Sequence, residues 1–394
     1  MGCSASKVNE PTGGTLPAAP VVRPTPTPAP APVPQPVKAV EPKPVAVPTP
    51  APDPQPVKPV EAEKPKPVAV KDDDNEAFGL LLCGAGESGK TTFTRQLKLK
   101  FLDGFKNEER IDFLRTIRGN LIETMQLLLI WLEHHNIEIE DDDARSAAEE
   151  IAEVDPFEAA FTDDIAEKLQ QLWEDPTIKQ AFQHKDETPI PDHIPYFYSK
   201  IDQLVSEDYI PTDEDVLRAR IRTIGIEAVT FNLEGALIRI FDVGGQKNER
   251  SKWSKVMDQV EGVIFCISFA EFDKPMFEDP SILRSSDALD IFESITHQEK
   301  FKASPVFLVC NKYDVFEEKV RNTDAFRKVF PDFTGDYHDP EACAAFFINK
   351  FLERAAPLSD ERPIVQYKIV ALRSNDVVNT ANAICKFISE KYFE

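Results

Sequence analysis

Apolar residues in this 394-residue chain follow two patterns, short unbroken runs and helical stripes. Unbroken runs of strand length occupy 77–83, 263–269 and 306–310. A strand that is covered on both faces needs apolar side chains at successive positions, as the strands of a parallel sheet do. These three runs therefore predict the central strands of a parallel β-sheet.

Three more strands are expected at 226–231, 236–242 and 364–371. The first two form a hairpin that turns at Gly235. Helical stretches lie between the later strands, and an amphipathic helix over 374–393 closes the chain. The predicted fold class is α/β, with one doubly wound sheet and helices on both of its faces.

The strand pattern is interrupted between 104 and 212, where apolar residues recur at steps of three and four. The longest stripe runs from Ile111 to Trp131 and predicts a helix over 107–131. These steps predict an all-helical insert. The segment holds 26 acidic and 9 basic side chains, which predicts a solvated acidic surface. Shorter helices are expected at 147–152, 165–173 and 196–205.

A proline-rich tract precedes the first strand. Residues 11–71 hold 20 of the 33 prolines, and the octapeptide at 34–41 recurs almost unchanged at 54–61. Fixed φ angles and missing N–H donors exclude a helix or a central strand there, which favours a disordered polyproline II tether. A plain spacer is the favoured interpretation, and a P-x-x-P ligand for an SH3-like domain is the alternative.

The extreme N-terminus fits a lipidation signal. Gly2 with Ser6 matches the N-myristoylation pattern, and Cys3 is placed for palmitoylation. One acyl chain holds a membrane marginally and two hold it stably. We therefore expect a lipid-anchored protein at the cytoplasmic face of the plasma membrane or an endomembrane, against the alternative of a terminus that merely begins Met-Gly.

Charge and cysteine content exclude several classes of protein. The net charge is −23, and the body from residue 72 onward carries −26, which argues against nucleic acid as a partner. The six cysteines show no paired spacing, as expected of reduced thiols in a cytosolic protein. No secretory signal is present, and the longest apolar run, 127–132, is too short to span a bilayer.

The strongest motif is a phosphate-binding loop. The stretch from Gly84 to Thr92 fits G-x-x-x-x-G-K-[ST], between an expected strand and a helix expected over 93–102. Backbone N–H groups of such a loop turn toward phosphate oxygens at the N-terminus of the helix. Lys90 would neutralise the β- and γ-phosphates, and Thr91 would hold Mg²⁺. A glycine turn after a buried strand is the alternative that this context disfavours.

A second motif follows a later strand in the chain order that phosphate chemistry requires. Asp242 can reach Mg²⁺ through water, and Gly245 offers its N–H to the γ-phosphate. Gln246 can orient the attacking water. An isolated D-x-x-G would be weak, but its position after the phosphate loop makes it a strong signal.

A third motif, N-K-x-D, predicts guanine selectivity. Asp314 can accept hydrogen bonds from guanine N1–H and the 2-amino group, whereas adenine has an acceptor at N1 and no 2-amino group. A site built on buried hydrogen bonds discriminates steeply against an analogue that lacks them. Asn311 would brace the loop, and the stem of Lys312 would cover the base. Alone, this pattern would be an Asn/Asp turn at a strand end.

The segment 215–225 joins the insert to the hairpin and is rich in arginine. Arg220 can reach the leaving phosphate and stabilise its charge, and Thr223 can complete the Mg²⁺ shell. The alternative is a basic connector that pairs with the acidic insert.

These motifs together resemble the α subunits of heterotrimeric G proteins over residues 76–390, including the helical insert and the built-in arginine. The resemblance implies a Ras-like GTPase domain (72–103 and 213–394), a helical lid (104–212) and the tether (1–71). It implies a switch that binds GTP or GDP with Mg²⁺, hydrolyses GTP as a timer, and works with a βγ dimer, a receptor and an effector.

The resemblance also assigns individual residues. It implies that Glu87 pairs with Arg220, that Asp192 approaches Lys312 from the lid, and that Arg250 binds Asp287 in the active state. The catalytic residues would be Arg220 and Gln246, and the metal ligands Thr91, Thr223 and, through water, Asp242. The nucleotide contacts would be Gly84, Glu87, Ser88, Gly89, Lys90, Thr91, Thr92, Asp192, Leu217, Arg218, Thr223, Asp242, Gly245, Asn311, Lys312, Asp314 and Ala371.

Several positions depart from the family pattern. The proline tract stands where the family has the N-terminal helix that docks βγ, and Ser254 follows Trp253 where an apolar residue is usual. The chain also ends before the family's receptor-contacting tail. The last guanine loop, 369–372, keeps Ala371, whose N–H could meet guanine O6.

Two other functions fit part of the sequence. A GTP-binding scaffold with little hydrolysis would act through its proline tract, but it would not need both Arg220 and Gln246. A P-loop ATPase or kinase would need no Asp314 in an N-K-x-D motif.

Overall fold

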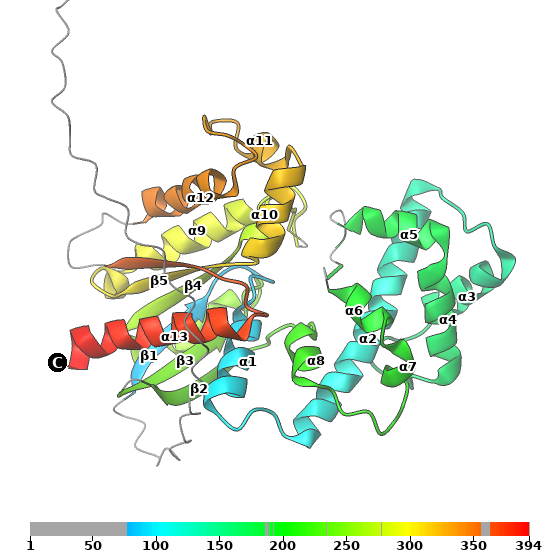
Figure 1. Ribbon diagram of the computed structural model, residues 1–394, viewed down its shortest axis with the longest axis horizontal. Coiled ribbons are helices and arrows are strands. Elements are labelled where there is room, and N and C mark those ends of the chain that lie inside the picture. The colour runs from blue at the N-terminus through cyan, green and yellow to red at the C-terminus, as the bar shows by residue number, and fades with distance from the viewer. Residues whose placement is uncertain are drawn as a thin grey trace, which may run out of the picture. The chain divides into compact units, whose positions relative to one another are not determined.

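The computed structural model describes residues 77–185, 188, 190–191, 193–233, 235–276, 278–355 and 363–393 (Figure 1). Three sequence predictions lie outside these residues: the lipidation signal at Gly2 and Cys3, the proline-rich tract and Asp192. Among the described helices, none has the length and apolar character needed to cross a membrane.

One six-stranded sheet organises the α/β part of the chain, with strand order β2-β3-β1-β4-β5-β6. β2 is antiparallel to β3, and all other neighbouring pairs are parallel. The predicted α/β sheet is thus confirmed. The strands are β1 (Phe78–Cys83), β2 (Ile226–Leu233), β3 (Ala236–Val243), β4 (Gly262–Ser268), β5 (Val306–Asn311) and β6 (Ile364–Lys368).

The register of the parallel strands brings the three motifs to one edge of the sheet. Leu82 of β1 lies beside Asp242 of β3, and Ser268 of β4 lies beside Asn311 of β5. Because all these strands run the same way, the loops that follow them meet at their carboxyl ends, where ligands bind in open α/β sheets.

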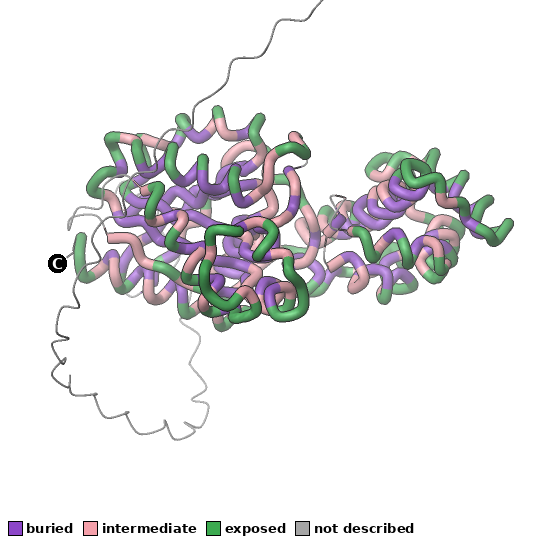
Figure 2. The backbone as a smooth tube through the Cα atoms, turned by 90° about the horizontal axis from the view of Figure 1, so that it is seen from above, coloured by how far each residue is buried: buried purple, intermediate pink, exposed green. Residues whose placement is uncertain are grey.

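Helices cover both faces of this sheet, and the central strands β1 and β5 are buried at every position. Figure 2 shows buried backbone running through the interior of the chain and exposed backbone around it. One face packs against α1 (Lys90–Phe101) and α13 (Ser374–Ile388). The other packs against α9 (Arg284–Thr296), α10 (Tyr313–Asn322) and α12 (Pro340–Arg354), with phenylalanines filling much of the space between. Side chains alternate between the two faces along each strand, which produces two separate apolar cores.

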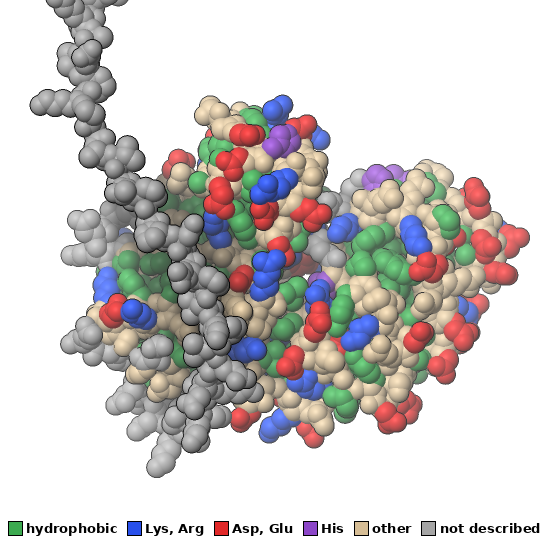
Figure 3. Space-filling view, viewed as in Figure 1, with side chains coloured by type: hydrophobic (Ala, Val, Ile, Leu, Met, Phe, Trp, Pro, Cys, Tyr) green, Lys and Arg blue, Asp and Glu red, His purple; other side chains and the backbone are tan. Residues whose placement is uncertain are grey.

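The insert has its own core. Its helices are α2 (Asn107–His135), α3 (Asp142–Ala152), α4 (Asp163–Glu174), α5 (Pro176–Gln183), α6 (Ile194–Tyr198) and α7 (Ile201–Leu204). Their inward apolar side chains form a cluster separate from the two around the sheet. Exposed acidic side chains gather on the visible surface around α3 and α4, as the composition predicted (Figure 3). Asp141, Thr162 and Asp175 cap α3, α4 and α5 through side-chain oxygens.

The remaining short elements connect these layers. They are α8 (Asp213–Arg218), α11 (Ala325–Val329), the 3₁₀ turns η2 (Arg250–Lys255), η3 (Met257–Gln259), η4 (Phe269–Glu271) and η5 (Glu299–Phe301), and the π-helical turn η6 (Ser389–Phe393).

Several predicted boundaries were wrong. The first helix begins at Lys90 rather than at 93, because the end of the phosphate loop is itself the first helical turn. The sixth strand ends at Lys368 rather than at 371, since the chain turns there toward Asn311. The last α-helix ends at Ile388 and continues as a π-helical turn. Ile111, expected on the apolar stripe of the long helix, is 48% exposed.

Candidate nucleotide-binding site

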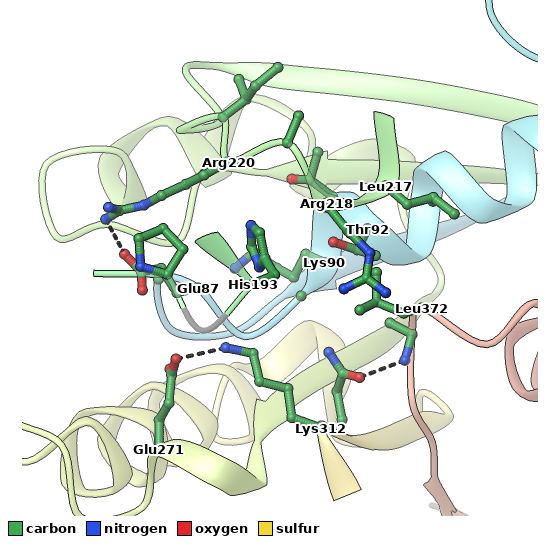
Figure 4. A pocket seen from close by; sticks show the side chains of 18 of the residues that line it. Glu87, Lys90, Thr92, His193, Leu217, Arg218, Arg220, Glu271, Lys312 and Leu372 are labelled. Carbon is green, nitrogen blue, oxygen red and sulfur yellow. Dashed lines mark hydrogen bonds and ion pairs between the residues drawn. The ribbon is translucent and has the colours of Figure 1, made fainter. Parts of the chain in front are cut away.

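The loops at the carboxyl edge of the sheet, together with residues of the insert, enclose a cavity of about 530 Å³ (Figure 4). That size falls in the range of small-molecule and cofactor sites. Gly84, Ser88 and Asp242 are buried next to it without lining it, and Asp192 lies outside the described residues. The predicted residues that line it are Glu87, Gly89, Lys90, Thr91, Thr92, Leu217, Arg218, Arg220, Thr223, Gly245, Gln246, Asn311, Lys312, Asp314 and Ala371.

The phosphate loop is held in a shape that glycine permits. Gly84 and Gly89 have φ angles of 139° and 94°. A Cβ at Gly89 would lie 2.0 Å from Asn311 Nδ2, so a side chain there would collide with the base-side loop. The loop opens directly into α1, and the first N–H groups of a helix have no partner within the helix, which makes a helix start a binding place for anions.

Lys90 is the buried cation of this loop. Its Nζ donates to Ala85 O at 2.7 Å, to Gly84 O at 3.2 Å and to Ser88 Oγ at 3.2 Å. Burial lowers the pKa of Lys90, since the charged form loses contact with water. An ammonium group held this way at the base of an anion site offers strong charge-assisted hydrogen bonds to phosphate oxygens.

A chain of ion pairs crosses the cavity wall. The expected pair between Glu87 and Arg220 is present, and Arg284 Nη1 bonds both Glu87 Oε2 at 2.9 Å and Glu271 Oε2 at 3.0 Å. Glu271 Oε1 in turn accepts from Lys312 Nζ at 2.7 Å (Figure 4). Five charged groups thus alternate in sign from Arg220 to Lys312.

The pKa of Glu87 reflects this network. Burial alone would raise it, but Arg220 and Arg284 outweigh burial and lower the pKa to about 2. Glu87 is therefore ionised at neutral pH and holds the guanidinium of Arg220. Sequence analysis missed Arg284 and Glu271, because neither belongs to a motif and Arg284 lies 197 positions from Glu87.

The side chains of Thr91, Thr223 and Asp242 form a candidate cation site beside Lys90. Thr91 Oγ1 and Thr223 Oγ1 are 2.6 Å apart, and Thr94 Oγ1 donates to Asp242 Oδ2 at 3.2 Å. Burial raises the pKa of Asp242 to about 6, and its Oδ1 is buried without a hydrogen-bond partner. An unpaired carboxylate oxygen next to two hydroxyls is the donor set that Mg²⁺ prefers, so the residues present fit that ion.

The segment after β3 packs against the phosphate loop. A Cβ at Gly245 would lie 2.5 Å from Lys90 Nζ and 2.6 Å from Gly84 O, so only glycine fits. A Cβ at Gly86 would lie 2.6 Å from Gln246 Nε2, which places the Gln246 amide over the loop. Gln246 and Arg220 thus both reach the phosphate end of the cavity, from different segments of the chain.

The expected contact between Arg250 and Asp287 is also present. Arg250 Nη1 and Nη2 bond the two oxygens of Asp287 at 2.8 and 2.6 Å, and Arg250 Nε donates to Gly245 O at 3.0 Å. The Trp253 indole donates to Gly244 O at 2.8 Å. The shorter aspartate therefore still forms a two-point pair that ties η2 to α9.

Asn311 braces the base end, as predicted. Its Nδ2 donates to Ser88 O at 2.9 Å, and its Oδ1 accepts from Ala371 N at 2.8 Å. The Ala371 amide, which we expected to be available for guanine O6, is thus engaged with Asn311. Asp314 Oδ2 lies 3.9 Å from Arg373 Nη2 at the solvent side.

The insert contributes residues that the sequence did not reveal. Ile190, Pro191 and His193 line the cavity from the segment before α6, and the figure shows the His193 ring directed into it (Figure 4). Leu372 and Arg373 line the base end. None of these residues belongs to a sequence motif. The family resemblance pointed only to Asp192, which lies between Pro191 and His193 in the chain.

Comparison with known proteins agrees with this geometry. Residues 58–388 match the family described as G-protein alpha subunit. Guanine nucleotide-binding protein subunit alpha-1 of Trichomonas vaginalis is 67% identical over 400 residues, which covers all of both chains. Guanine nucleotide-binding protein alpha-2 subunit of Dictyostelium discoideum is 35% identical over 69% of this chain and 78% of its own, and guanine nucleotide-binding protein G(o) subunit alpha of Geodia cydonium is 34% identical over 70% and 78%. The chain therefore belongs to the family of G-protein α subunits.

Proposed function

We propose that this chain is a molecular switch that binds GTP and GDP in the cavity and hydrolyses GTP. The observation that carries the proposal is the convergence of Arg220 and Gln246 on the phosphate loop. One supplies charge to the leaving phosphate, and the other can hold the attacking water. A scaffold that only bound GTP would need neither residue in this position.

The chain's own residues divide the work. Lys90 and the loop N–H groups hold the β- and γ-phosphates, and Asp314 selects the base. Thr91, Thr223 and Asp242 would hold Mg²⁺, which neutralises phosphate charge when bound. Glu87 keeps the guanidinium of Arg220 at the cavity wall until charge develops on the phosphate.

Single-turnover hydrolysis of prebound GTP tests this proposal. Arg220→Cys should slow the step by roughly 10³–10⁵, the range for arginines that act in this way in such enzymes. Gln246→Leu should also slow it strongly. Both variants should still bind GTP, because neither residue forms the phosphate cradle, and Arg115→Cys, on an exposed part of α2, is the matched control. Parent-rate hydrolysis by both variants would leave the GTP-binding scaffold as the better account.

Signalling partners follow from the family and from a second cavity. We include a βγ dimer, a receptor and an effector among the proposed partners. A groove of about 470 Å³ between η2 and α9 is lined by Trp253, Met257, Ile291 and Ile295, next to the Arg250–Asp287 pair. Its shape would change with that pair, so it suits an effector that reads the nucleotide state. The SH3-like partner of the proline tract remains a sequence-based proposal.

Membrane attachment is proposed from Gly2 and Cys3 alone. Gly2→Ala should release the chain to the soluble fraction, and Cys3→Ser should leave a reversible anchor, because one myristoyl chain binds only marginally. Cell fractionation measures this, and equal membrane retention of all three forms would contradict it.

A further inference from the structure

Arg220 lies two positions after the end of α8, and the last turn of that helix together with the two residues after it forms a short arm, 216–220. α8 ends at Arg218 within this arm, so its last carbonyls have no partner further along the helix. Two of these carbonyls, on Val216 and Ala219, are instead bonded by one side chain from α1. The arm is therefore held by contacts from elsewhere in the chain in addition to its helical hydrogen bonds, from Val216 N to Thr212 O at 3.0 Å and from Ala219 N to Asp215 O at 2.8 Å.

Arg95 makes this contact from the core side. Its Nη1 donates to Val216 O at 2.8 Å and to Ala219 O at 2.7 Å. Arg95 is 7% exposed, and its guanidinium lies 4.8 Å from the centre of the Phe113 ring. It follows Lys90 by five positions on α1, so the helix that begins at the phosphate loop also holds the arm.

Asn120 makes a matching contact from the insert side. Its Nδ2 donates to Arg220 O at 2.9 Å, and the residue is 5% exposed within α2. The carbonyl it binds belongs to the hydrolytic arginine itself. The main chain of Arg220 is thus held by the insert, while its guanidinium is held by Glu87 of the phosphate loop.

We propose that Asn120 and Arg95 are positioning residues for GTP hydrolysis, which set the place of Arg220 by holding the carbonyls of its arm. The inference rests on the proposed function and gives the insert a part in hydrolysis beyond covering the nucleotide. An arginine acts on the transferred phosphate only when placed to within a fraction of an ångström, and a misplacement of about 1 Å can cost on the order of 10²-fold in rate.

A purely structural role is the competing explanation, because any buried carbonyl needs a partner. The two explanations differ in how they combine with loss of Arg220. A residue that acts through Arg220 has nothing left to position once that side chain is gone. A residue that only stabilises the fold should have the same effect with or without Arg220.

The experiment is a double-mutant cycle on single-turnover hydrolysis of prebound GTP, using the full chain. Asn120→Asp keeps the shape but turns a carboxylate oxygen toward the Arg220 carbonyl. We expect it to slow hydrolysis by roughly 10-fold or more in the parent background and by less than about 2-fold in the Arg220→Ala background. Gln126→Glu is the matched control. Gln126 also donates from α2 to main-chain carbonyls, but these belong to Ile151 and Val154, at and just after the end of α3, and not to the arm.

Arg95 provides an independent test with a conservative rescue. Arg95→Met removes both hydrogen bonds at similar length, whereas Arg95→Lys keeps an ammonium that can reach the same carbonyls. We expect the Met variant to hydrolyse GTP at least roughly 10-fold more slowly than the Lys variant, with this difference also lost in the Arg220→Ala background.

The outcomes are distinct. Equal losses in both backgrounds, or no loss from Asn120→Asp in the parent, would overturn the positioning role while leaving GTP hydrolysis intact. Parent-rate hydrolysis by Arg220→Ala itself would overturn both this inference and the proposed role of the arginine.

Discussion

At the phosphate end of the cavity Lys90 and Asp242 are almost fully buried, whereas at the base end the side chains of Asp314 and Arg373 are 39% and 63% exposed. Lys90 already bonds three oxygens of its own loop. Asp314 Oδ2 lies 3.9 Å from Arg373 Nη2, a long distance for an ion pair. The protein itself thus pairs the charged groups at the phosphate end, whereas at the base end it fixes Asn311 and leaves the carboxylate of Asp314 partly exposed to a ligand.

This difference separates affinity from selectivity. Charges act more strongly where water is excluded, so a change at the phosphate end should weaken all nucleotides alike. At the base end the interaction depends on matching donors to acceptors, so a change there should alter which base is bound. The following predictions test that separation, beginning with the largest effect.

Lys90→Met should have the largest effect. It removes charge-assisted hydrogen bonds to phosphate of about 1.5–3 kcal/mol each, so affinity for both GTP and GDP should fall by at least about 100-fold. The preference for guanine over xanthine should not change. Titration with fluorescent nucleotides measures both quantities, with Lys100→Met, at an exposed position of the same helix, as control. A changed base preference would break the proposed separation.

Asp314→Asn should change selectivity. One acceptor oxygen becomes an amide donor that faces the guanine donors, which should cost GTP binding several kcal/mol, on the order of 2–4. Xanthine carries an oxygen where guanine has its 2-amino group, so the affinity for XTP should rise. Competition between GTP and XTP reports the result, and Asp324→Asn, at an exposed site, is the control. Unchanged GTP binding would remove the guanine assignment.

Glu87 predicts a pH dependence at the phosphate end. Its folded pKa of about 2 lies below the ordinary 4.5, so its contribution to stability is complete above pH 4.5 and is lost as the pH falls toward 2. With its side chain 25% exposed, we expect about 1–3 kcal/mol from this group. Urea unfolding of the nucleotide-free protein at pH 7 and pH 4 should show a smaller decrease for Glu87→Gln than for the parent. An equal decrease would mean that the ion-pair chain does not hold Glu87 ionised.

Arg373→Ala should have the smallest effect. An exposed pair at 3.9 Å contributes less than about 1 kcal/mol, so GTP affinity should change by no more than a few-fold. Calorimetric titration would detect a larger loss, and such a loss would mean that Arg373 holds Asp314 in place before the nucleotide binds.

Sequence alone predicted those parts of the site that are local. The phosphate loop, the Asp242 segment and the Asn311 motif each hold their geometry within a few residues of a strand end, and unbroken apolar runs located the strands. The contacts between distant segments were not predictable in the same way. Arg284 pairs with Glu87 only because the fold brings the two residues together, and Glu271 joins the ion-pair chain through Arg284 and Lys312; no spacing in the sequence signals these contacts.

Buried polar residues in helices were missed for a related reason. Arg95 and Asn120 look like ordinary polar positions of α1 and α2. Their partners are main-chain carbonyls that lie 100 to 124 positions further along the chain. A main-chain acceptor leaves no trace in the residue type that carries it. The engaged amide of Ala371 escaped prediction for the same reason.

The most direct test of the account is a single-turnover assay that offers GTP and ATP separately to the purified full chain with Mg²⁺. We predict that GTP is bound and that its γ-phosphate is released in one phase, while ATP at the same concentration is neither retained nor hydrolysed. Retention of GTP without phosphate release would contradict the hydrolytic switch, and equal turnover of ATP would contradict the assignment of Asp314 as the residue that selects guanine.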